Sequence, residues 1–419
     1  MTIMFYMVML LCMINLFRLT AYLIGSDIYS MKLARTKGNK KRWHLPTISV
    51  LVPAHNEEHT IERCMDSVYN SDYPQGKLEM IVCNDGSTDR TRKIVEAYKR
   101  THRNGCKIRL INRPNKGKAA TLNYALRRSA RHQLIMCLDS DSCLDPGALR
   151  NAAQYFRDRD VVALSSNVNI IEDSSLITLL QRLEYLVCYQ MKKGQAQFGV
   201  EYIVGGIGSI FRRSNLKKVS YYDTNTMTED IDLTLKILVN KSRQQKIAFA
   251  ADSIVYTEPA HSLKELMKQR FRWKFGRNQT YFKHLAYFFS KEHRHNKRLT
   301  WFMLPFSLLQ DLFFLLEPII ILYFAYIIIY YHDYTTLISA VVVLSVYLTF
   351  NIWSTSHLRL YDKLRLSIFA PVAYFLMYIL SFAEYYALIK SLIDLPTLRQ
   401  SIFQKHITWN SPTRKKVLN

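Results

Sequence analysis

The pattern of hydrophobic and polar residues divides the chain into three parts, and the first part is an apolar segment. Residues 1–24 are apolar except for Tyr6, Arg18 and a few small polar groups. Because about 20 apolar residues are enough to cross a bilayer, this pattern predicts an N-terminal transmembrane anchor, to which we assign residues 1–30. A cleaved signal peptide would need a basic start and a small-residue cleavage site, and the segment has neither.

The second part, residues 47–260, alternates short apolar runs with helical patterns. The run at 48–53 is β-branched and ends in proline, which is typical of a buried strand. Further strands are expected at 78–83, 108–112 and 134–138, with helices at 56–69, 88–100 and 118–130. Strands and helices that alternate at this pitch predict a parallel α/β sheet, with its ligand at the carboxyl ends of the strands.

The third part begins near residue 299 and is again apolar. Stretches 312–331, 337–353 and 366–392 are each long enough to span a bilayer. The basic loop 359–365 belongs on the cytoplasmic side, together with the second part. Three spans after a cytoplasmic domain then leave the basic tail outside, although Lys and Arg usually concentrate on the cytoplasmic side. Either 366–392, which contains Glu384, is a hairpin or re-entrant element, or the tail violates the rule.

The formal net charge of +24 makes nucleic-acid binding a hypothesis to consider. No zinc-finger, helix-turn-helix or RRM signature accompanies the charge, so we expect no nucleic-acid partner. Basic residues concentrate instead beside the anchor, in a linker at 31–46, where they favour anionic lipid headgroups and the cytoplasmic side. The seven cysteines show no CxxC or paired spacing, which indicates buried reduced thiols.

Two candidate motifs follow expected strands. In Asn84-Asp85-Gly86-Ser87, Asp85 can accept hydrogen bonds from a nucleoside base, although the same residues also make ordinary turns. In Asp139-Ser140-Asp141, two carboxylates can converge on one hard cation, Mg²⁺ or Mn²⁺, that also holds a diphosphate. The alternative for the second motif is a solvated loop or a helix cap.

Two further motifs lie closer to the apolar part. Thr228-Glu229-Asp230 offers a carboxylate as general base for a sugar hydroxyl, and it is equally suited to cap a helix. The segment 269–273, read as a helix, places Gln269, Arg272 and Trp273 on one face. Arginine suits phosphate and tryptophan suits a sugar ring, but a basic amphipathic helix on the membrane surface has the same pattern.

Taken in order, these four motifs and Val-Pro-Ala-His-Asn-Glu at 52–57 resemble the processive family 2 glycosyltransferases. That family includes the synthases of cellulose, chitin, hyaluronan and bacterial poly-N-acetylglucosamine. The resemblance covers about residues 47–273 by motif. It implies an α/β, GT-A-type cytoplasmic domain with a nucleotide-binding, mostly parallel sheet over 47–260. Around it would lie an interfacial region at 261–298, transmembrane helices at 299–395 and a basic tail at 396–419, all at the plasma membrane.

The resemblance also implies roles for single residues. Pro53, Asn56, Glu57 and Asp85 would contact the uridine, and Lys118 would lie near the diphosphate. Asp139 and Asp141 would hold the nucleotide and a Mg²⁺ or Mn²⁺ ion, with Asp141 as the more direct ligand. Asp230 would be the general base, supported by Glu229. The acceptor end and the leaving diphosphate would be bound by Gln269, Arg272 and Trp273.

Within the family, the likeness is strongest to bacterial poly-β-1,6-N-acetylglucosamine synthases, through chain length and the Trp409-Asn-Ser-Pro-Thr-Arg414 motif. This implies an inverting enzyme that polymerises a UDP-sugar, UDP-N-acetylglucosamine, into an exported β-linked polysaccharide. Its partners would be the growing polymer, the lipid bilayer and a small membrane accessory subunit. The alternatives are a hyaluronan-, chitin- or glucan-type synthase, a non-processive transferase that loads a lipid carrier, or an inactive binding scaffold.

Overall fold

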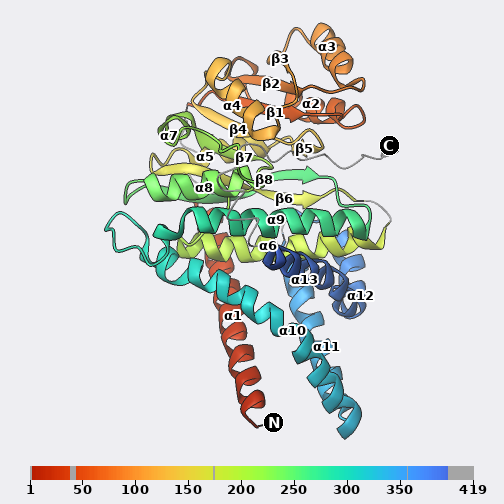
Figure 1. The fold of residues 1–419 in the computed structure, drawn as a ribbon. Helices are drawn as coiled ribbons and strands as arrows, with labels where there is room; N and C mark the ends of the chain where they lie inside the picture. The colour runs from red at the N-terminus through yellow and green to blue at the C-terminus, as the bar shows by residue number, and fades with distance from the viewer. Residues whose placement is uncertain (1, 38–43, 173–174, 356, 395–419) are drawn as a thin grey trace.

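The computed structural model of the protein describes residues 2–37, 44–172, 175–355 and 357–394. Figure 1 shows a sheet with its covering helices at one end, two long helices beneath it, and further helices that extend from the other end. The strands are β1 (Ile48–Ala54), β2 (Leu78–Asp85), β3 (Lys107–Arg113), β4 (Leu134–Cys137), β5 (Ser142–Leu144), β6 (Val161–Ile170), β7 (Ser209–Arg212) and β8 (Lys246–Thr257). The helices around the sheet are α2 (Ile61–Tyr69), α3 (Thr91–Thr101), α4 (Lys118–Arg128), α5 (Ala148–Tyr155), α7 (Arg213–Lys218) and α8 (Glu229–Asn240). The longer helices are α1 (Thr2–Lys37), α6 (Leu176–Phe198), α9 (Leu263–Lys283), α10 (Leu304–Tyr331), α11 (Tyr334–Trp353), α12 (Leu360–Leu376) and α13 (Tyr378–Ile393).

The eight strands form one sheet in the order β3-β2-β1-β4-β7-β6-β8-β5. The four strands predicted from sequence, β1 to β4, are parallel to one another. The other half is mixed, because β7 runs antiparallel to both β4 and β6, and β5 runs antiparallel to β8. Because β6 and β7 are antiparallel, β7 begins at the end of the sheet where β6 finishes, and the connection does not cross back to the other end. The expected mostly parallel sheet is therefore correct for its first half only.

The two faces of the sheet are buried under different helices. Along β1, Ile48, Val50 and Val52 pack with α2 and α5, whereas Leu51 packs with α4 and α8. This alternation is the period of two expected for a strand that is covered on both sides. Because helices cover both faces of the sheet, the strand ends and the loops that follow them remain open for a ligand site.

The two long helices beneath the sheet, α6 and α9, join it to the remaining helices (Figure 1). Helix α1 packs along α6, where Ser26 donates a hydrogen bond to Gln190 at 2.6 Å. The helices approach closely at Gly194, since a Cβ there would lie 2.5 Å from the carbonyl oxygen of Tyr22. Glycine is therefore needed at this crossing.

Two helices of the described chain have the length and composition to cross a membrane. They are Arg298–Tyr331, which comprises a π-helical first turn and α10, and α11. The predicted span at 366–392 is broken, because Leu360–Ala373 and Tyr378–Ile393 meet at 65°. The pair makes a third span only if it is counted as one broken helix, and a re-entrant element is the other alternative. The anchor at 1–30 and the membrane topology stay predictions. Linker residues 38–43 and the tail from residue 395, with Trp409–Arg414, lie outside the described residues.

Candidate active site

The carboxyl end of β2 carries Asp85, which fixes the loop before α4. Its Oδ1 accepts hydrogen bonds from the backbone N–H of Lys116 at 3.0 Å and the hydroxyl of Thr121 at 2.6 Å, and its Oδ2 accepts one from the N–H of Gly117 at 2.9 Å. The next residue, Gly86, has a φ of +70°, and a Cβ there would lie 2.6 Å from the backbone nitrogen of Asn115. Asp85 therefore positions the start of α4 directly.

The turn after β1 is fastened to the turn after β2. Pro53 lies within β1, and Asn56, at a φ of +56°, accepts a hydrogen bond from the N–H of Thr88 at 2.8 Å. The N–H of Glu57 donates to the hydroxyl of Thr91 at 2.8 Å. These contacts place the two turns beside each other, as expected for a site at the carboxyl edge of parallel strands.

His55 joins the same two turns and was not singled out from the sequence. Its Nδ1 lies 2.9 Å from the carbonyl oxygen of Asp85, and its Nε2 lies 3.4 Å from Nδ2 of Asn115. The only available signal was its position inside the 52–57 motif. The ring thereby links the ends of β1 and β2 to the loop before α4.

Lys118, the first residue of α4, brings two predicted carboxylates together. Its Nζ lies 2.6 Å from Oδ1 of Asp139 and 3.5 Å from Oε1 of Glu229. Burial acts to lower the pKa of Lys118, but the charges of Asp139 and Glu229 outweigh it and hold that pKa well above its usual range. Lys118 therefore remains a cation at the point where α4, β4 and α8 meet.

Asp230 occupies the other side of this cluster. Its Oδ2 accepts a hydrogen bond from the N–H of Gly206 at 2.7 Å, and its Oδ1 accepts one from the N–H of Ile231 at 2.9 Å. Burial raises the pKa of Asp230, the charge of Glu229 raises it further, and Lys118 opposes both. Gly206 gave no sequence signal as a site residue, yet a Cβ there would lie 3.2 Å from Nζ of Lys118 and 3.4 Å from Oδ2 of Asp230.

Asp139 and Asp141 lie directly after β4, as predicted. Asp141 is only 8% exposed, its Oδ1 lies 2.9 Å from the hydroxyl of Ser142, and that hydroxyl lies 3.0 Å from Oγ1 of Thr257 on β8. Within the described part of the chain, no three His, Cys, Asp or Glu side chains are grouped as metal ligands. The two carboxylates nevertheless suit Mg²⁺ or Mn²⁺, which take oxygen ligands and draw many of them from phosphate and water.

Helix α9 carries the 269–273 motif and contacts the loop before Asp230. Gln269, Arg272 and Trp273 are all partly exposed, and the charge of Arg272 lowers the pKa of Asp230, though as a smaller contribution than those above. A Cβ at Gly276 would lie 2.5 Å from Oγ1 of Thr228, so the two segments are in tight contact. The motif helix and the Thr228–Asp230 segment therefore form one surface.

Arg270, an unassigned position within the motif, anchors α9 to two other helices. It is 5% exposed and donates to Glu184 of α6 at 2.6 Å and to Glu384 of α13 at 3.0 Å. Its guanidinium also lies 4.7 Å from the ring centroid of Trp273. Sequence reading missed it because its partners lie 86 and 114 residues away along the chain.

Part of the chain is similar in sequence to known proteins. Residues 49–220 match the family described as Glycosyl transferase family 2. Poly-beta-1,6-N-acetyl-D-glucosamine synthases of Staphylococcus epidermidis and Staphylococcus aureus (strain COL) are 30% identical over 232 and 236 residues. Each alignment covers 55% of this chain and 54% or 55% of the relative, so the match spans about half the length of those proteins.

A solved structure supports the fold. The mannosyltransferase PcManGT from Pyrobaculum calidifontis, in complex with GDP-Man and Mn²⁺, superposes with a TM-score of 0.54 and covers 90% of this chain and 97% of its own. At 20% sequence identity, this likeness speaks for the fold alone. The mixed sheet and its flanking helices are those of a GT-A glycosyltransferase.

Proposed function

We propose that this chain, whose residues 49–220 form a family 2 glycosyltransferase domain, is an inverting, processive polymerase of N-acetylglucosamine that uses UDP-N-acetylglucosamine. The observation that carries the proposal is the cluster in which Lys118 bridges Asp139 and Glu229 while Asp230 is held beside them. A cation between a nucleotide site and a catalytic carboxylate is what diphosphate departure needs.

The donor nucleotide would lie over the turns after β1 and β2. Pro53, Asn56 and Glu57 shape one wall, and Asp85 the other. Asp85 already accepts two hydrogen bonds on Oδ1 and one on Oδ2, which leaves one acceptor position on Oδ2 for a nucleoside base. Lys118 would meet the diphosphate at the N-terminus of α4, where the helix dipole also favours negative charge.

Asp139 and Asp141 would hold a Mg²⁺ or Mn²⁺ ion together with the diphosphate. The bound ion would supply charge compensation for the departing UDP. Asp139 would keep its contact with Lys118 as well, so that the nucleotide and the cation side chain are fixed relative to each other. Asp141, buried against β5 and β8, would be held rigidly by Ser142.

Asp230 would act as the general base. As the acceptor hydroxyl oxygen attacks the anomeric carbon, its proton passes to a carboxylate oxygen of Asp230, and the bond between that carbon and UDP breaks on the opposite face. An α-linked donor then gives a β-linked product. The raised pKa of Asp230 favours this role, since a base works best when its pKa lies near the operating pH.

The acceptor would lie between the Thr228–Asp230 segment and α9. Gln269, Arg272 and Trp273 would bind the end of the growing polymer and the leaving diphosphate. The apolar helices next to α9 support a location in the plasma membrane and export of the polymer between them, with a small accessory subunit as a further partner.

Nucleotide release by the purified chain in detergent, measured with several sugar donors, tests this proposal. With Mg²⁺ or Mn²⁺ present, UDP release from UDP-N-acetylglucosamine should exceed both UDP release from UDP-glucose or UDP-glucuronate and GDP release from GDP-mannose. The product should be a polymer whose size and linkage mass spectrometry can define. Release with a different donor would contradict the sugar assignment, and a single transferred sugar would favour a non-processive transferase. If no donor releases nucleotide, the assignment of the site is wrong.

A further inference from the structure

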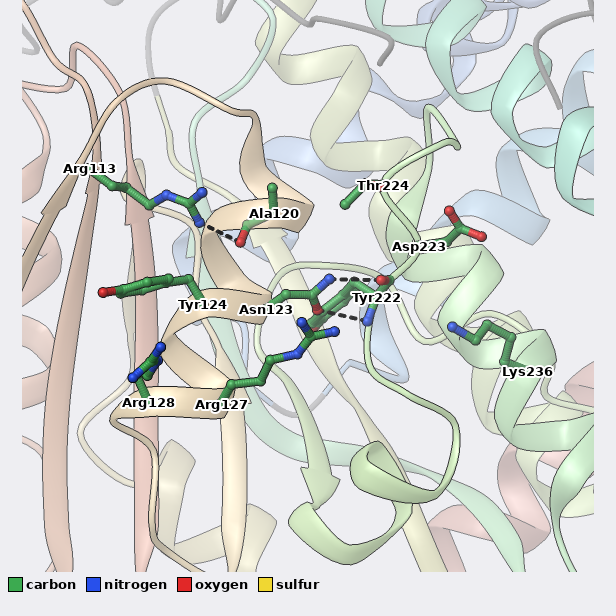
Figure 2. Close-up of a pocket in the computed structure, with 10 residues that line it drawn as sticks. All are labelled: Arg113, Ala120, Asn123, Tyr124, Arg127, Arg128, Tyr222, Asp223, Thr224 and Lys236. Atoms are coloured by element: carbon green, nitrogen blue, oxygen red, sulfur yellow. Dashed lines mark hydrogen bonds between the residues drawn. The ribbon is translucent and has the colours of Figure 1, made fainter. Parts of the chain in front are cut away.

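A cavity of about 580 Å³ lies between α4 and α8, on the sheet face that these helices cover. Figure 2 shows its lining, which comes from the end of β3, the outer side of α4, the segment before α8 and α8 itself. The ten lining residues are Arg113, Ala120, Asn123, Tyr124, Arg127, Arg128, Tyr222, Asp223, Thr224 and Lys236. At about 1.5 Å per residue, Arg127 is about 14 Å along α4 from Lys118. This cavity, which we call the α4–α8 groove, therefore extends along α4 away from the candidate active site, and Ala120 at its near end is two residues from Lys118.

The α4–α8 groove is strongly basic. Arg113, Arg127, Arg128 and Lys236 contribute four positive charges, and Asp223 is the one carboxylate among the lining residues. The described residues place no carboxylate within ion-pair distance of any of the four cations. Asp223 is itself paired with Lys283, outside the lining. The groove therefore carries a net positive charge, and among its cations Lys236 feels nearby carboxylates, those of Asp232 and Asp223.

The cations are held in place by other contacts. Arg113 donates to the carbonyl oxygen of Ala120 at 2.6 Å and lies 5.1 Å from the ring centroid of Tyr124. Lys236 donates to the carbonyl oxygen of Tyr221 at 2.7 Å. Burial lowers the pKa of Lys236, which a bound anion would offset. Since these side chains are already ordered, an anion would not have to immobilise them.

Two of the four cations can be explained without a ligand. Arg127 and Arg128 lie in the last turn of α4, where basic residues complement the helix dipole and are solvated. The helix dipole of α4 does not explain Arg113 and Lys236, which come from β3 and α8 and line the same cavity (Figure 2). Convergence of cations from three elements on one cavity is typical of an anion site.

We propose that the α4–α8 groove binds a soluble organic polyphosphate. Guanidinium groups match phosphate oxygens in pairs, so several phosphates would satisfy Arg113, Arg127 and Arg128 together. The volume exceeds what phosphates alone fill, and the exposed ring of Tyr124 offers a flat surface for an organic group. The helices α4 and α8 begin in the candidate active site, at Lys118 and Glu229, and Asn123 of α4 makes two hydrogen bonds of 2.9 Å with the backbone of Tyr222, in the segment before α8. The ligand would therefore set the spacing of the two helices.

Pyrophosphate is the probe. Its binding to the full chain in detergent is measured by isothermal titration calorimetry in excess EDTA, which removes metal-bridged binding at Asp139 and Asp141. The double variant Arg127→Ala/Arg128→Ala should bind about tenfold more weakly or worse, which corresponds to 1.4 kcal/mol. Lys236→Gln, on the other helix, should also weaken binding. Thermal unfolding confirms that each variant is folded.

The controls test whether any pair of exposed cations at a helix C-terminus gives the same result. Lys99→Ala/Arg100→Ala removes two exposed cations from the last turn of α3 and should leave the affinity unchanged. Lys118→Ala, at the other end of α4, reports pyrophosphate bound in the candidate active site, and Arg127→Ala/Arg128→Ala should weaken binding in that background as well. Equal affinity in all variants overturns the proposal, as does a loss confined to Lys118→Ala, which would place pyrophosphate in the candidate active site. Tighter binding of dihexanoylphosphatidylglycerol than of pyrophosphate overturns it too, because the ligand would then be a lipid headgroup.

Discussion

Gly276 on α9 lies against Thr228, so closely that a methyl group at Gly276 would sit 2.5 Å from the hydroxyl oxygen and 2.9 Å from the backbone nitrogen of Thr228. Because the second of these atoms is backbone, the clash cannot be relieved by a side-chain rotation alone. The contact therefore sets the distance between the motif helix and the segment that carries Asp230.

Gly276→Ala is expected to lower kcat for polymer formation by about tenfold or more, since small displacements of reacting groups are costly. The measurement is UDP release by equal amounts of folded protein. Gly76→Ala is the matched control, because nothing lies within 4 Å of a Cβ at Gly76. Similar kcat values for both variants would show that the spacing of α9 and Thr228 does not matter for turnover.

Lys118→Met is expected to move the acidic limb of the pH–rate profile to higher pH. Lys118 lowers the pKa of Asp230 against the effects of burial and Glu229, so its removal raises that pKa further. A base must be deprotonated to act, and more alkaline conditions are then needed to reach that state. Lys116→Met removes an exposed neighbouring charge and should leave the limb in place. An unmoved limb in Lys118→Met contradicts the electrostatic coupling.

Asp141→Ala is expected to abolish nearly all turnover, and excess EDTA should do the same to the unaltered chain. Both remove charge compensation for the departing diphosphate. Restoring Mg²⁺ or Mn²⁺ should recover activity in the unaltered chain but not in the variant. Asp160→Asn, which removes an exposed carboxylate outside the candidate active site, serves as the control. Full activity in EDTA would exclude the proposed metal role.

Asp230→Asn is expected to reduce polymer formation by about 10²–10⁴ while UDP binding is retained, because the proton acceptor is lost and the residues proposed to bind UDP are unchanged. The same change should make Tm less dependent on pH over the range in which Asp230 ionises. The pKa of Asp230 is higher in the folded chain than in the unfolded chain, so its ionisation opposes folding as the pH rises; asparagine removes this pH-dependent cost and gives up one of the two backbone hydrogen bonds. Calorimetry and UDP titration measure the two effects. A parallel loss of UDP binding would make Asp230 a donor ligand instead.

Trp273→Ala is expected to give shorter polymers, and Trp273→Phe should have a milder effect. A flat ring that stacks on the acceptor sugar retains the chain between additions, by about 0.5–1.5 kcal/mol for aromatic contacts of this kind. The polymer made by equal amounts of folded protein is sized. Unchanged length in Trp273→Ala, with a lower yield of protein, would indicate that Trp273 only anchors α9, where it already contacts Arg270.

The sequence was most informative where structure is local. The first four strands follow from apolar runs, and Asp85 and Asp139 were placed at strand ends because a strand and the turn after it are neighbours in the chain. The bend between α12 and α13 and the reversed direction of β7 depend on contacts between distant segments, which no periodicity encodes.

The same limit applies to the candidate site. Lys118 was placed near a diphosphate by resemblance, but its contact with Glu229 joins segments 111 residues apart in numbering (229 minus 118). Gly206 and Gly276 matter through what they exclude, and an absent side chain leaves no hydrophobic or charged signal. Sequence alone therefore could not identify positions whose role depends on contacts with residues distant in the chain.

The ion pairs of Arg270 have a consequence for the order in which the protein is made. Glu384 lies in the last described helix, so the ribosome adds it long after Arg270 and Glu184. Until α13 emerges, the buried guanidinium has only one of its two carboxylate partners, and leaving buried charge incompletely paired is costly. Nascent or truncated chains that stop before α13 should hold α9 poorly, so that catalytic competence arrives only when synthesis of the helical part is complete.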